Sequence, residues 1–379
     1  MNISSAVQRI FRSKRPEDII VNNSQNGIGL KPPSVQQFND LDTSGFDFKL
    51  FVGVTSFLIA SVGLLNWLVD PLWYGSGNRL TGKNFAFNER VSKTNLFLRT
   101  KGKSYDCLIL GSSRVIALKA SAFSGQNCFN YAVKGGEIPD FISIAKFVKD
   151  NGIYPKLVYV GVDEFNFVKK DKVNKDNTDV SKLATPSIYQ AYFSSDVFMF
   201  SLMTLLGQSP DPANYYNSKF EMEEFPTKPI FKPEFFPAQS PQQCDLTQVN
   251  SYAQLRNIFP NAKFIGYVPP RAAWSVINET YARNITGCTL EGFHKVAQLY
   301  DEMYDFSIPS PLTKNPDSTF DGSHFSPAAN DEVAEVLQGK PSDISLKVHK
   351  YGLSEYQKLY KGKLKEFLKE QGELKRWKD

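Results

Sequence analysis

Residues 105–114 read YDCLILGSSR, a short apolar run that ends in a glycine and two serines. An apolar run of this length, bounded by a turn-forming residue, is typical of a buried strand. Three more runs of the same kind follow along the chain: Asn127–Val133 (NCFNYAV), Pro155–Val162 (PKLVYVGV) and Ala262–Val268 (AKFIGYV). Helical patterns over residues 115–124 and Ile138–Asp150 lie between them. Strands that alternate with helices predict an α/β fold with a parallel sheet covered on both faces.

Further helical patterns flank this array. Residues 88–102 read NERVSKTNLFLRTKG and predict an amphipathic helix, and Thr289–Tyr304 predicts another. Within the long segment before the fourth strand, Ser195–Leu206 (SDVFMFSLMTLL) is strongly apolar but too short to cross a bilayer. A packed helix is the favoured interpretation of this segment, and contact with a membrane surface is the alternative.

One stretch has the length of a membrane span. Leu50–Val69 reads LFVGVTSFLIASVGLLNWLV and contains no charged residue. Twenty helical residues reach about 30 Å, the thickness of a bilayer core. Trp67 and Trp73 lie near its end, where an aromatic belt is expected. A buried core helix is the alternative, whereas a cleaved signal peptide is disfavoured because the preceding segment is too long.

The residues that flank this span predict its orientation. Basic residues precede it, which places the N-terminus in the cytoplasm by the positive-inside rule: Arg9, Arg12, Lys14, Arg15, Lys31 and Lys49. Arg79 and Lys83 follow it, so the asymmetry is modest. The rest of the chain is then expected outside the cytoplasm.

The chain is predicted to contain four parts. They are a flexible cytoplasmic tail (1–48), a transmembrane anchor (49–70), an α/β domain with an irregular insertion at about 170–243 (71–345) and a basic amphipathic C-terminal helix (346–379). A docked or solvated position is favoured for the last helix over binding to a membrane or a partner.

Composition limits the classes of function. The net charge of +5 arises from 44 basic and 39 acidic residues, which gives no indication of nucleic-acid binding. The chain has only three histidines, a poor supply for a histidine-based metal site, and its four cysteines form no CxxC pair. Cys107 and Cys128 lie in strand-like runs and are expected to be plain core residues. Cys244 and Cys288 lie in loop-like sequence and are the better disulfide candidates.

Candidate catalytic residues lie where functional groups gather in parallel sheets, at the carboxyl ends of the strands. Ser113 follows a strand in a tight turn, which exposes its hydroxyl and offers its backbone N–H to an oxyanion. Near the C-terminus, Asp321 precedes His324 by three positions, so its carboxylate can bind Nδ1 and leave Nε2 free. A serine needs such a base to act as a nucleophile. The pattern therefore predicts a Ser-His-Asp triad.

These segments resemble the SGNH (GDSL-like) hydrolase superfamily. Gly111-Ser112-Ser113 is similar to its block I, Asn130–Gly135 to block II, and Asp321–His324 to block V. Residues 66–71 (NWLVDP) and 88–90 (NER) resemble a membrane-anchored bacterial branch, which includes alginate O-acetylation proteins and the D-alanyl transfer protein of teichoic acid synthesis. The resemblance implies a flavodoxin-like three-layer parallel sheet, with the Gly135 and Ser113 N–H groups in the oxyanion hole and no metal or organic cofactor.

One position departs from the family pattern. Block III usually supplies an asparagine side chain to the oxyanion hole, but here Asp163 falls at or near that position. An ionised carboxylate would repel an oxyanion, so Asn166 is the candidate third donor. Arg114, Asp163 and Arg271 are candidate substrate-binding residues.

The expected function is that of a membrane-anchored serine esterase or O-acyltransferase. Its acyl group, acetyl as the first candidate, would be carried to or from a cell-surface or exported polysaccharide. The membrane and a membrane-bound acyl donor are the expected partners, and nucleic acid is not. The alternative is a non-catalytic glycan-binding or assembly subunit that retains the fold.

Overall fold

The computed structural model describes residues 47–169, 179–183, 188–209, 215–224 and 231–376. The tail predicted over residues 1–48 lies almost entirely outside the described residues, as does part of the predicted insertion. The chain divides into a first unit that ends at Val54 and a second unit, Thr55–Asp379, to which the strands belong.

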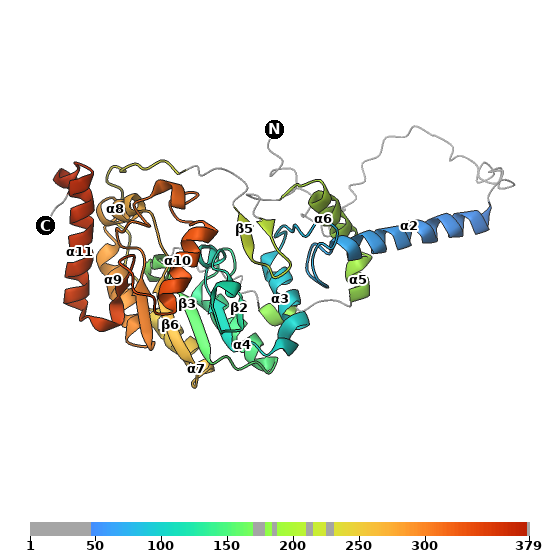
Figure 1. Ribbon diagram of the computed structural model, residues 1–379, viewed down its shortest axis with the longest axis horizontal. Helices are drawn as coiled ribbons and strands as arrows, with labels where there is room; N and C mark the ends of the chain where they lie inside the picture. Colours follow the sequence, from blue (N-terminus) through green and yellow to red (C-terminus); the bar gives the residue numbers. More distant parts are fainter. Residues whose placement is uncertain (1–46, 170–178, 184–187, 210–214, 225–230, 377–379) are drawn as a thin grey trace, which may run out of the picture. The chain divides into compact units, whose positions relative to one another are not determined.

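Six strands form one sheet in the order β2-β1-β3-β6-β7-β8 (Figure 1). Their bounds are β1 Cys107–Leu110, β2 Cys128–Asn130, β3 Leu157–Gly161, β6 Lys263–Val268, β7 Glu302–Asp305 and β8 Leu346–Lys347. The first five strands are parallel, and β8 pairs antiparallel with β7. Their near-continuous apolar sequences follow from this arrangement, since a parallel sheet is buried on both faces. The predicted α/β class with a mostly parallel sheet is confirmed.

Helices cover the sheet. In one row, α4 (Ile138–Asp150) contacts α7 (Val249–Ile258), α7 contacts α9 (Thr286–Ala297), and α9 contacts both α8 (Ala273–Tyr281) and α11 (Leu353–Glu370). Elsewhere α3 (Glu89–Thr100) begins after the cap Asn88, and α10 (Pro327–Leu337) contacts β5 (Met222–Glu224), a short strand outside the main sheet. The C-terminal helix α11 is docked, because one apolar stripe along it joins the core: Tyr356, Tyr360, Leu364, Phe367 and Leu368.

Two of the predicted helices are wrong in part. Residues 115–124 do not form a helix but lie in short turns around Ser113–Val115 and Ala120–Ala122. The Asn130 side chain explains this, because its amide donates to the Val115 and Leu118 carbonyls, at 3.0 and 2.6 Å, which a helix would use itself. The helix predicted over Thr289–Tyr304 ends at Ala297, and its last residues form β7, whose pairing with β6 overrides the local pattern.

The segment between β3 and β6 is partly regular. It contains α5 (Ile188–Tyr192), α6 (Ser195–Leu205) and a hairpin of β4 (Tyr215–Tyr216) and β5 (Met222–Glu224). The helix predicted at 195–206 is therefore present.

The apolar stretch before the domain forms α2 (Phe48–Val69), which is long and apolar enough to cross a membrane.

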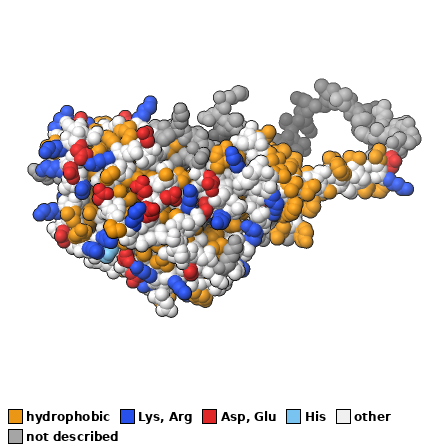
Figure 2. All heavy atoms as spheres, in the orientation of Figure 1, with side chains coloured by type: hydrophobic (Ala, Val, Ile, Leu, Met, Phe, Trp, Pro, Cys, Tyr) orange, Lys and Arg blue, Asp and Glu red, His pale blue; other side chains and the backbone are white. Residues whose placement is uncertain are grey.

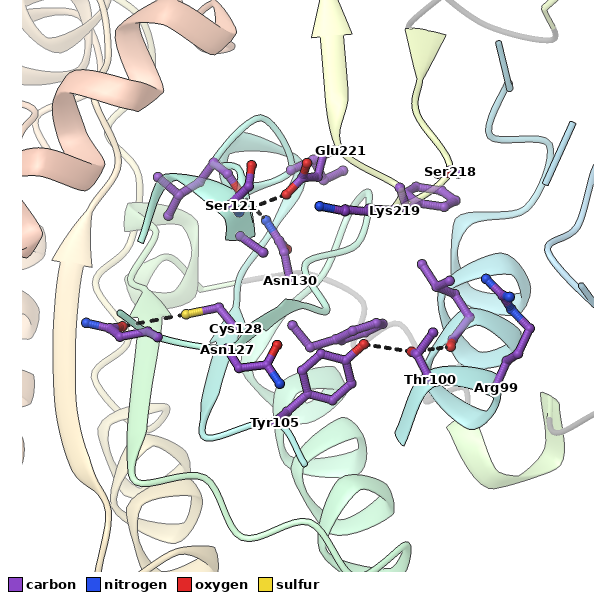
Figure 3. A pocket seen from close by; sticks show the side chains of 17 residues that line it. Arg99, Thr100, Tyr105, Ser121, Asn127, Cys128, Asn130, Ser218, Lys219 and Glu221 are labelled. Atoms are coloured by element: carbon purple, nitrogen blue, oxygen red, sulfur yellow. Dashed lines mark hydrogen bonds between the residues drawn. The ribbon is translucent and has the colours of Figure 1, made fainter. Parts of the chain in front are cut away.

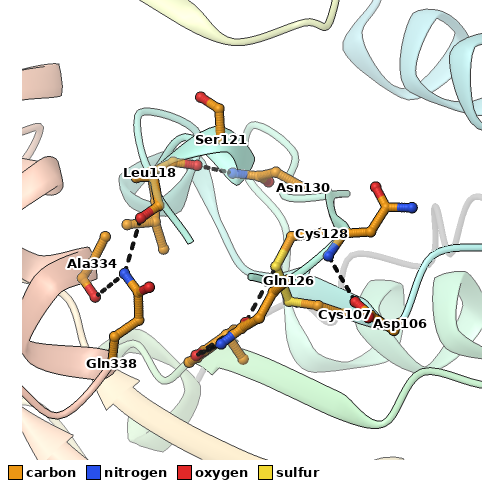
Figure 4. The surroundings of a disulfide bond; sticks show 12 residues. Asp106, Cys107, Leu118, Ser121, Gln126, Cys128, Asn130, Ala334 and Gln338 are labelled. Carbon is orange, nitrogen blue, oxygen red and sulfur yellow. Dashed lines mark hydrogen bonds between the residues drawn. A yellow bond between two sulfur atoms is a disulfide. The ribbon is translucent and has the colours of Figure 1, made fainter. Parts of the chain in front are cut away.

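All four cysteines are in disulfide bonds. Cys244 is bonded to Cys288, as the sequence favoured. Cys107 and Cys128 are buried as predicted, but they are also bonded to each other (Figure 4). They occupy directly paired positions on the neighbouring strands β1 and β2, with Cα atoms 4.2 Å apart, a relationship that sequence alone does not reveal.

The two disulfides are expected to stabilise the domain to different extents. Their sequence separations are 21 and 44 residues, so chain entropy predicts losses of about 3 kcal/mol for Cys107→Ser/Cys128→Ser and about 4 kcal/mol for Cys244→Ser/Cys288→Ser. Urea unfolding of the full chain in mild detergent, followed by tryptophan fluorescence, measures both. Two double variants as stable as the wild type would contradict the expectation.

Candidate active site

Close contact between two strand ends sets the position of Ser113. An ideal Cβ on Gly111 would lie 2.3 Å from Val115 Cγ2, and one on Gly161 would lie 2.5 Å from the same atom. Any larger residue at either glycine would therefore displace Val115 and the turn that contains Ser113. The Gly111 carbonyl also accepts a hydrogen bond from the Val133 N–H at 3.0 Å, which brings the turn after β2 to the same place.

Three predicted residues form a continuous hydrogen-bonded chain. Ser113 Oγ lies 2.8 Å from His324 Nε2, and His324 Nδ1 lies 2.7 Å from Asp321 Oδ2. The other oxygen of Asp321 accepts the backbone N–H groups of Ser323 and His324, at 2.9 and 2.8 Å. The histidine ring is therefore held by its own loop and faces the serine.

The charge of Asp321 sets the tautomer of His324. Burial opposes ionisation of this carboxyl group, but its hydrogen bonds with His324 and the histidine charge lower its pKa to about 2. An ionised carboxylate can only accept, so Nδ1 carries the proton and Nε2 of the neutral ring is the acceptor for the Ser113 hydroxyl. That arrangement suits a general base.

Two backbone donors in the turns that follow β1 and β2 are open. Within the described part of the chain, the N–H groups of Ser113 and Gly135 have no acceptor. Gly135 has a φ of +61°, a left-handed conformation that favours glycine, and it is exposed with no atom within 4 Å of an ideal Cβ. The sequence predicts both groups as donors to an oxyanion, and nothing in their hydrogen bonding opposes that prediction.

One face of α3 holds the segment that leads to Gly135. Glu89 accepts the Lys134 N–H at 2.8 Å, and Arg90 donates to the Lys134 carbonyl at 3.1 Å. One turn further along α3, Lys93 Nζ donates to the Ala132 carbonyl at 2.5 Å, and the Thr94 and Tyr131 hydroxyls are hydrogen-bonded at 2.7 Å. The helix therefore contacts nearly every residue between Tyr131 and Lys134.

Lys93 is fully buried in this contact. Burial lowers the pKa of Lys93 to about 8, and the nearby Glu89 carboxylate opposes that shift. Neither Lys93 nor Glu89 belongs to a motif that predicts a role in the site. The only signal was their four-residue spacing, which places both on one face of a helix.

A buried charge network lies behind the serine. Arg114 Nη1 is 3.1 Å from Asp163, its Nη2 donates to Glu164 at 2.9 Å, and its Nε donates to Ser323 Oγ at 2.7 Å. Arg271 Nη1 lies 3.1 Å from the same Glu164 and 2.5 Å from Glu279. Although burial favours the neutral acid, the two guanidinium groups hold the pKa of Glu164 below its ordinary value.

These contacts revise four of the predicted site residues. Asp163 and Arg271 are 0% and 3% exposed, so neither lines an open surface as a substrate-binding residue would, and the partly buried Arg114 binds Asp163 and Glu164. The Asn166 amide is also buried and donates to Tyr252 Oη at 3.1 Å and to the Asp163 carbonyl at 3.3 Å. Asn166 therefore does not join Ser113 and Gly135 as an oxyanion donor.

Two hollows in the domain differ in their relation to the Ser113–His324–Asp321 chain. A cleft of about 480 Å³ reaches Asp321, and its other lining residues include Phe231, Phe236, Ser275 and Arg283. A second cavity of about 410 Å³ lies beside β2, where Figure 3 shows Ser121, Asn130 and Lys219. None of the residues that line the second cavity belongs to the Ser113–His324–Asp321 chain.

Comparisons of the chain with protein-family models, curated proteins and solved structures found no match in any of the three. The resemblance to SGNH hydrolases therefore stays a prediction, carried by the motifs. Among the described residues, no group of three or more His, Cys, Asp or Glu side chains is placed to hold a metal ion.

Glu89 provides a test of the α3 contact. Glu89→Ala would leave the Lys134 N–H without its acceptor and the buried Lys93 ammonium without its nearby carboxylate, and an unsatisfied buried donor costs about 1–3 kcal/mol. We expect lower stability in urea and slower labelling of Ser113 by a fluorophosphonate in the folded protein, because the Gly135 turn is less firmly held. Glu89→Gln should fall between the wild type and Glu89→Ala in stability and labelling rate. Glu332→Ala, at an exposed position, is the control. Unchanged stability and labelling in Glu89→Ala would contradict this role.

The lowered pKa of Asp321 predicts that the free energy of unfolding falls in acid. A carboxyl group whose pKa is lower in the folded chain stabilises the fold above its ordinary pKa, and that contribution is lost as the pH falls toward about 2. The wild type should therefore lose more stability between about pH 4 and pH 2 than Asp321→Asn does. Urea midpoints measured across this range test it, with Asp317→Asn, at an exposed position, expected to follow the wild type. Parallel curves for the wild type and Asp321→Asn would oppose it.

Proposed function

We propose that this protein is a membrane-anchored, extracytoplasmic serine esterase or O-acyltransferase of the SGNH type. The observation that carries the proposal is the chain Ser113 Oγ–His324 Nε2 and His324 Nδ1–Asp321 Oδ2, with distances of 2.8 and 2.7 Å. A serine, a base and an acid in this order and geometry have one well-understood use, which is acyl transfer through a covalent serine ester.

In the proposed reaction, Ser113 Oγ attacks the carbonyl carbon of an ester while His324 Nε2 takes the hydroxyl proton. The tetrahedral intermediate collapses, the C–O bond to the leaving alcohol breaks, and His324 returns the proton to that alcohol. Water or a sugar hydroxyl then attacks the acyl-serine with His324 as the base, which frees Ser113. Ionised Asp321 stabilises the imidazolium that forms in each half-reaction.

The oxyanion would be held by backbone groups. The Ser113 and Gly135 N–H groups have no acceptor among the described residues, and Gly135 is exposed, so both are available. The carboxylate of Asp163 does not need to face the oxyanion, because it is bound by Arg114 in the interior. An aspartate at the block III position is therefore compatible with an oxyanion hole made of backbone N–H groups.

The strand order also supports the SGNH type. Taken in chain order, the five parallel strands lie as 2-1-3-4-5, the order of flavodoxin-like sheets, and the candidate residues follow their carboxyl ends. Fold alone does not establish activity, so the chemistry rests on the side chains.

The substrate class comes from the resemblance and from the cleft. A cleft that reaches Asp321 and combines Phe231 and Phe236 with polar side chains fits a carbohydrate, whose faces are apolar and whose edges carry hydroxyls. We propose a cell-surface or exported polysaccharide as the acyl acceptor or donor, with acetyl as the first candidate. Transfer from a membrane-bound donor, rather than hydrolysis, follows from the resemblance to the alginate and teichoic acid proteins.

Covalent labelling tests the proposal. A fluorophosphonate should label the wild type, and aryl acetate should be turned over, while Ser113→Ala should lose labelling and lose turnover by about 10⁴-fold or more, as removal of a triad serine does elsewhere. His324→Ala should lose a comparable amount. Ser124→Ala is the matched control, because Ser124 is exposed and its side chain makes no hydrogen bond within the described residues.

The outcomes separate the two classes of function. Labelling that disappears only when Ser113 or His324 is changed supports the enzyme. Equal labelling of the wild type and Ser113→Ala would reject Ser113 as the nucleophile. No labelling or turnover in any variant, together with binding of an acetylated polysaccharide, would favour the non-catalytic glycan-binding subunit.

A further inference from the structure

Helix α6 has its polar and apolar faces reversed. In a helix on the surface of a soluble domain, apolar residues face the core and polar residues face water. Here two of the three buried residues, Ser201 and Thr204, carry hydroxyl groups. The outer face carries Met199, Leu205 and Leu206, which are 54%, 41% and 71% exposed.

The buried hydroxyl groups of α6 find hydrogen-bond acceptors within the protein. Ser201 Oγ lies 2.9 Å from two acceptors for its single proton, Asn66 Oδ1 and the Val197 carbonyl, and Thr204 Oγ1 donates to the Phe200 carbonyl at 2.8 Å. The inner face of α6 is therefore satisfied, and its apolar outer face meets the surroundings.

The neighbouring helix α5 extends the same surface. Ile188, Tyr189 and Phe193 are 52%, 77% and 53% exposed. Large apolar side chains exposed side by side are uncommon on water-facing surfaces and mark an interaction site. We call the exposed side chains of Ile188, Tyr189, Phe193, Met199, Leu205 and Leu206 the apolar foot.

The apolar foot is fixed beside the last turns of α2. The Asn66 amide donates to the Tyr192 and Ser194 carbonyls, at 2.7 and 3.3 Å, and an ideal Cβ on Gly63 would lie 2.6 Å from the Phe193 ring. The same turns of α2 also expose Leu64 and Trp67. Figures 1 and 2 show α5 and α6 beside this end of α2 and hydrophobic side chains gathered there.

A cation marks the polar border of this surface. The exposed Arg79 lies with its guanidinium carbon 4.6 Å from the centre of the Trp67 ring, and it also donates to the Trp67 carbonyl. An aromatic ring and a basic group at the end of an apolar helix are expected where acyl chains give way to lipid headgroups.

We propose that the apolar foot is embedded in the leaflet in which α2 ends, with lipid acyl chains as its occupant. Continuity with the apolar surface of α2 and the cation at its border favour lipid over a protein partner. The foot would add a second, monotopic contact that restrains how residues 71–376 turn about the anchor. This inference rests on the proposed membrane span of α2, and it is independent of the proposed chemistry.

Spin labels test the inference on the full chain in lipid nanodiscs. Because all four native cysteines are in disulfides, single cysteines can be labelled at Tyr189→Cys, Met199→Cys and Leu206→Cys. Molecular oxygen concentrates among acyl chains, whereas a water-soluble nickel chelate stays outside. We expect each label to collide several-fold more with oxygen and several-fold less with nickel than a label at Tyr154→Cys, which is 67% exposed on the domain.

A label at Leu58→Cys in α2 tests the membrane span separately from the lipid contact of the apolar foot. Lipid exposure at Leu58 with nickel access at Met199 and Leu206 would overturn the apolar foot and leave the span. Nickel access at Leu58 as well would overturn both. Low collision with both reagents at the three foot positions would mean that protein covers them, which also rejects a lipid contact.

Discussion

The guanidinium of Arg114, only 14% of whose side chain is exposed, lies one residue after Ser113 and binds Asp163, Glu164 and Ser323. Those three partners follow β3 or belong to the His324 loop, so a single side chain joins three segments that are far apart in the sequence. The charge must be compensated on all sides, because an unpaired cation in the interior costs several kcal/mol. The hydrogen bond between Ser113 and His324 therefore depends on a salt-bridge network that touches neither of their reacting atoms.

The same kind of support appears on the other side of the serine. Helix α3 presents Glu89, Arg90, Lys93 and Thr94 to the backbone that leads to Gly135. Polar contacts of this kind are directional, and each buried member must be satisfied, so the segment has little freedom to move. Salt bridges and hydrogen bonds thus hold the inner side of the site. Its outer side is open, because the side chains of His324 and Asp321 are 37% and 34% exposed.

Much of the site could be predicted because its residues follow recognisable strand ends. Ser113, Gly135 and the Asp321–His324 pair were identified from short motifs, and the structure brings the serine, histidine and aspartate within hydrogen-bond distance. The salt-bridge network has no such motif: the sequence predicts Arg114, Asp163 and Arg271 as substrate-binding residues and Asn166 as an oxyanion donor. A lone arginine or asparagine in a loop has no pattern that reveals whether it points inward. Arg271 binds Glu164, and Asn166 binds Tyr252, across separations of more than 80 residues that only the fold closes.

The sequence by itself determined the α/β class, the apolar helix before the domain and the helices with a regular apolar period, because local periodicity reflects which face is buried. Only the tertiary structure decided that Cys107 and Cys128 are bonded, that residues 302–305 form a strand and that α6 buries its hydroxyls and exposes its apolar face. These features depend on what lies opposite each residue. A neighbouring strand, a buried guanidinium or the end of α2 is brought there by the fold and leaves no trace in the local sequence.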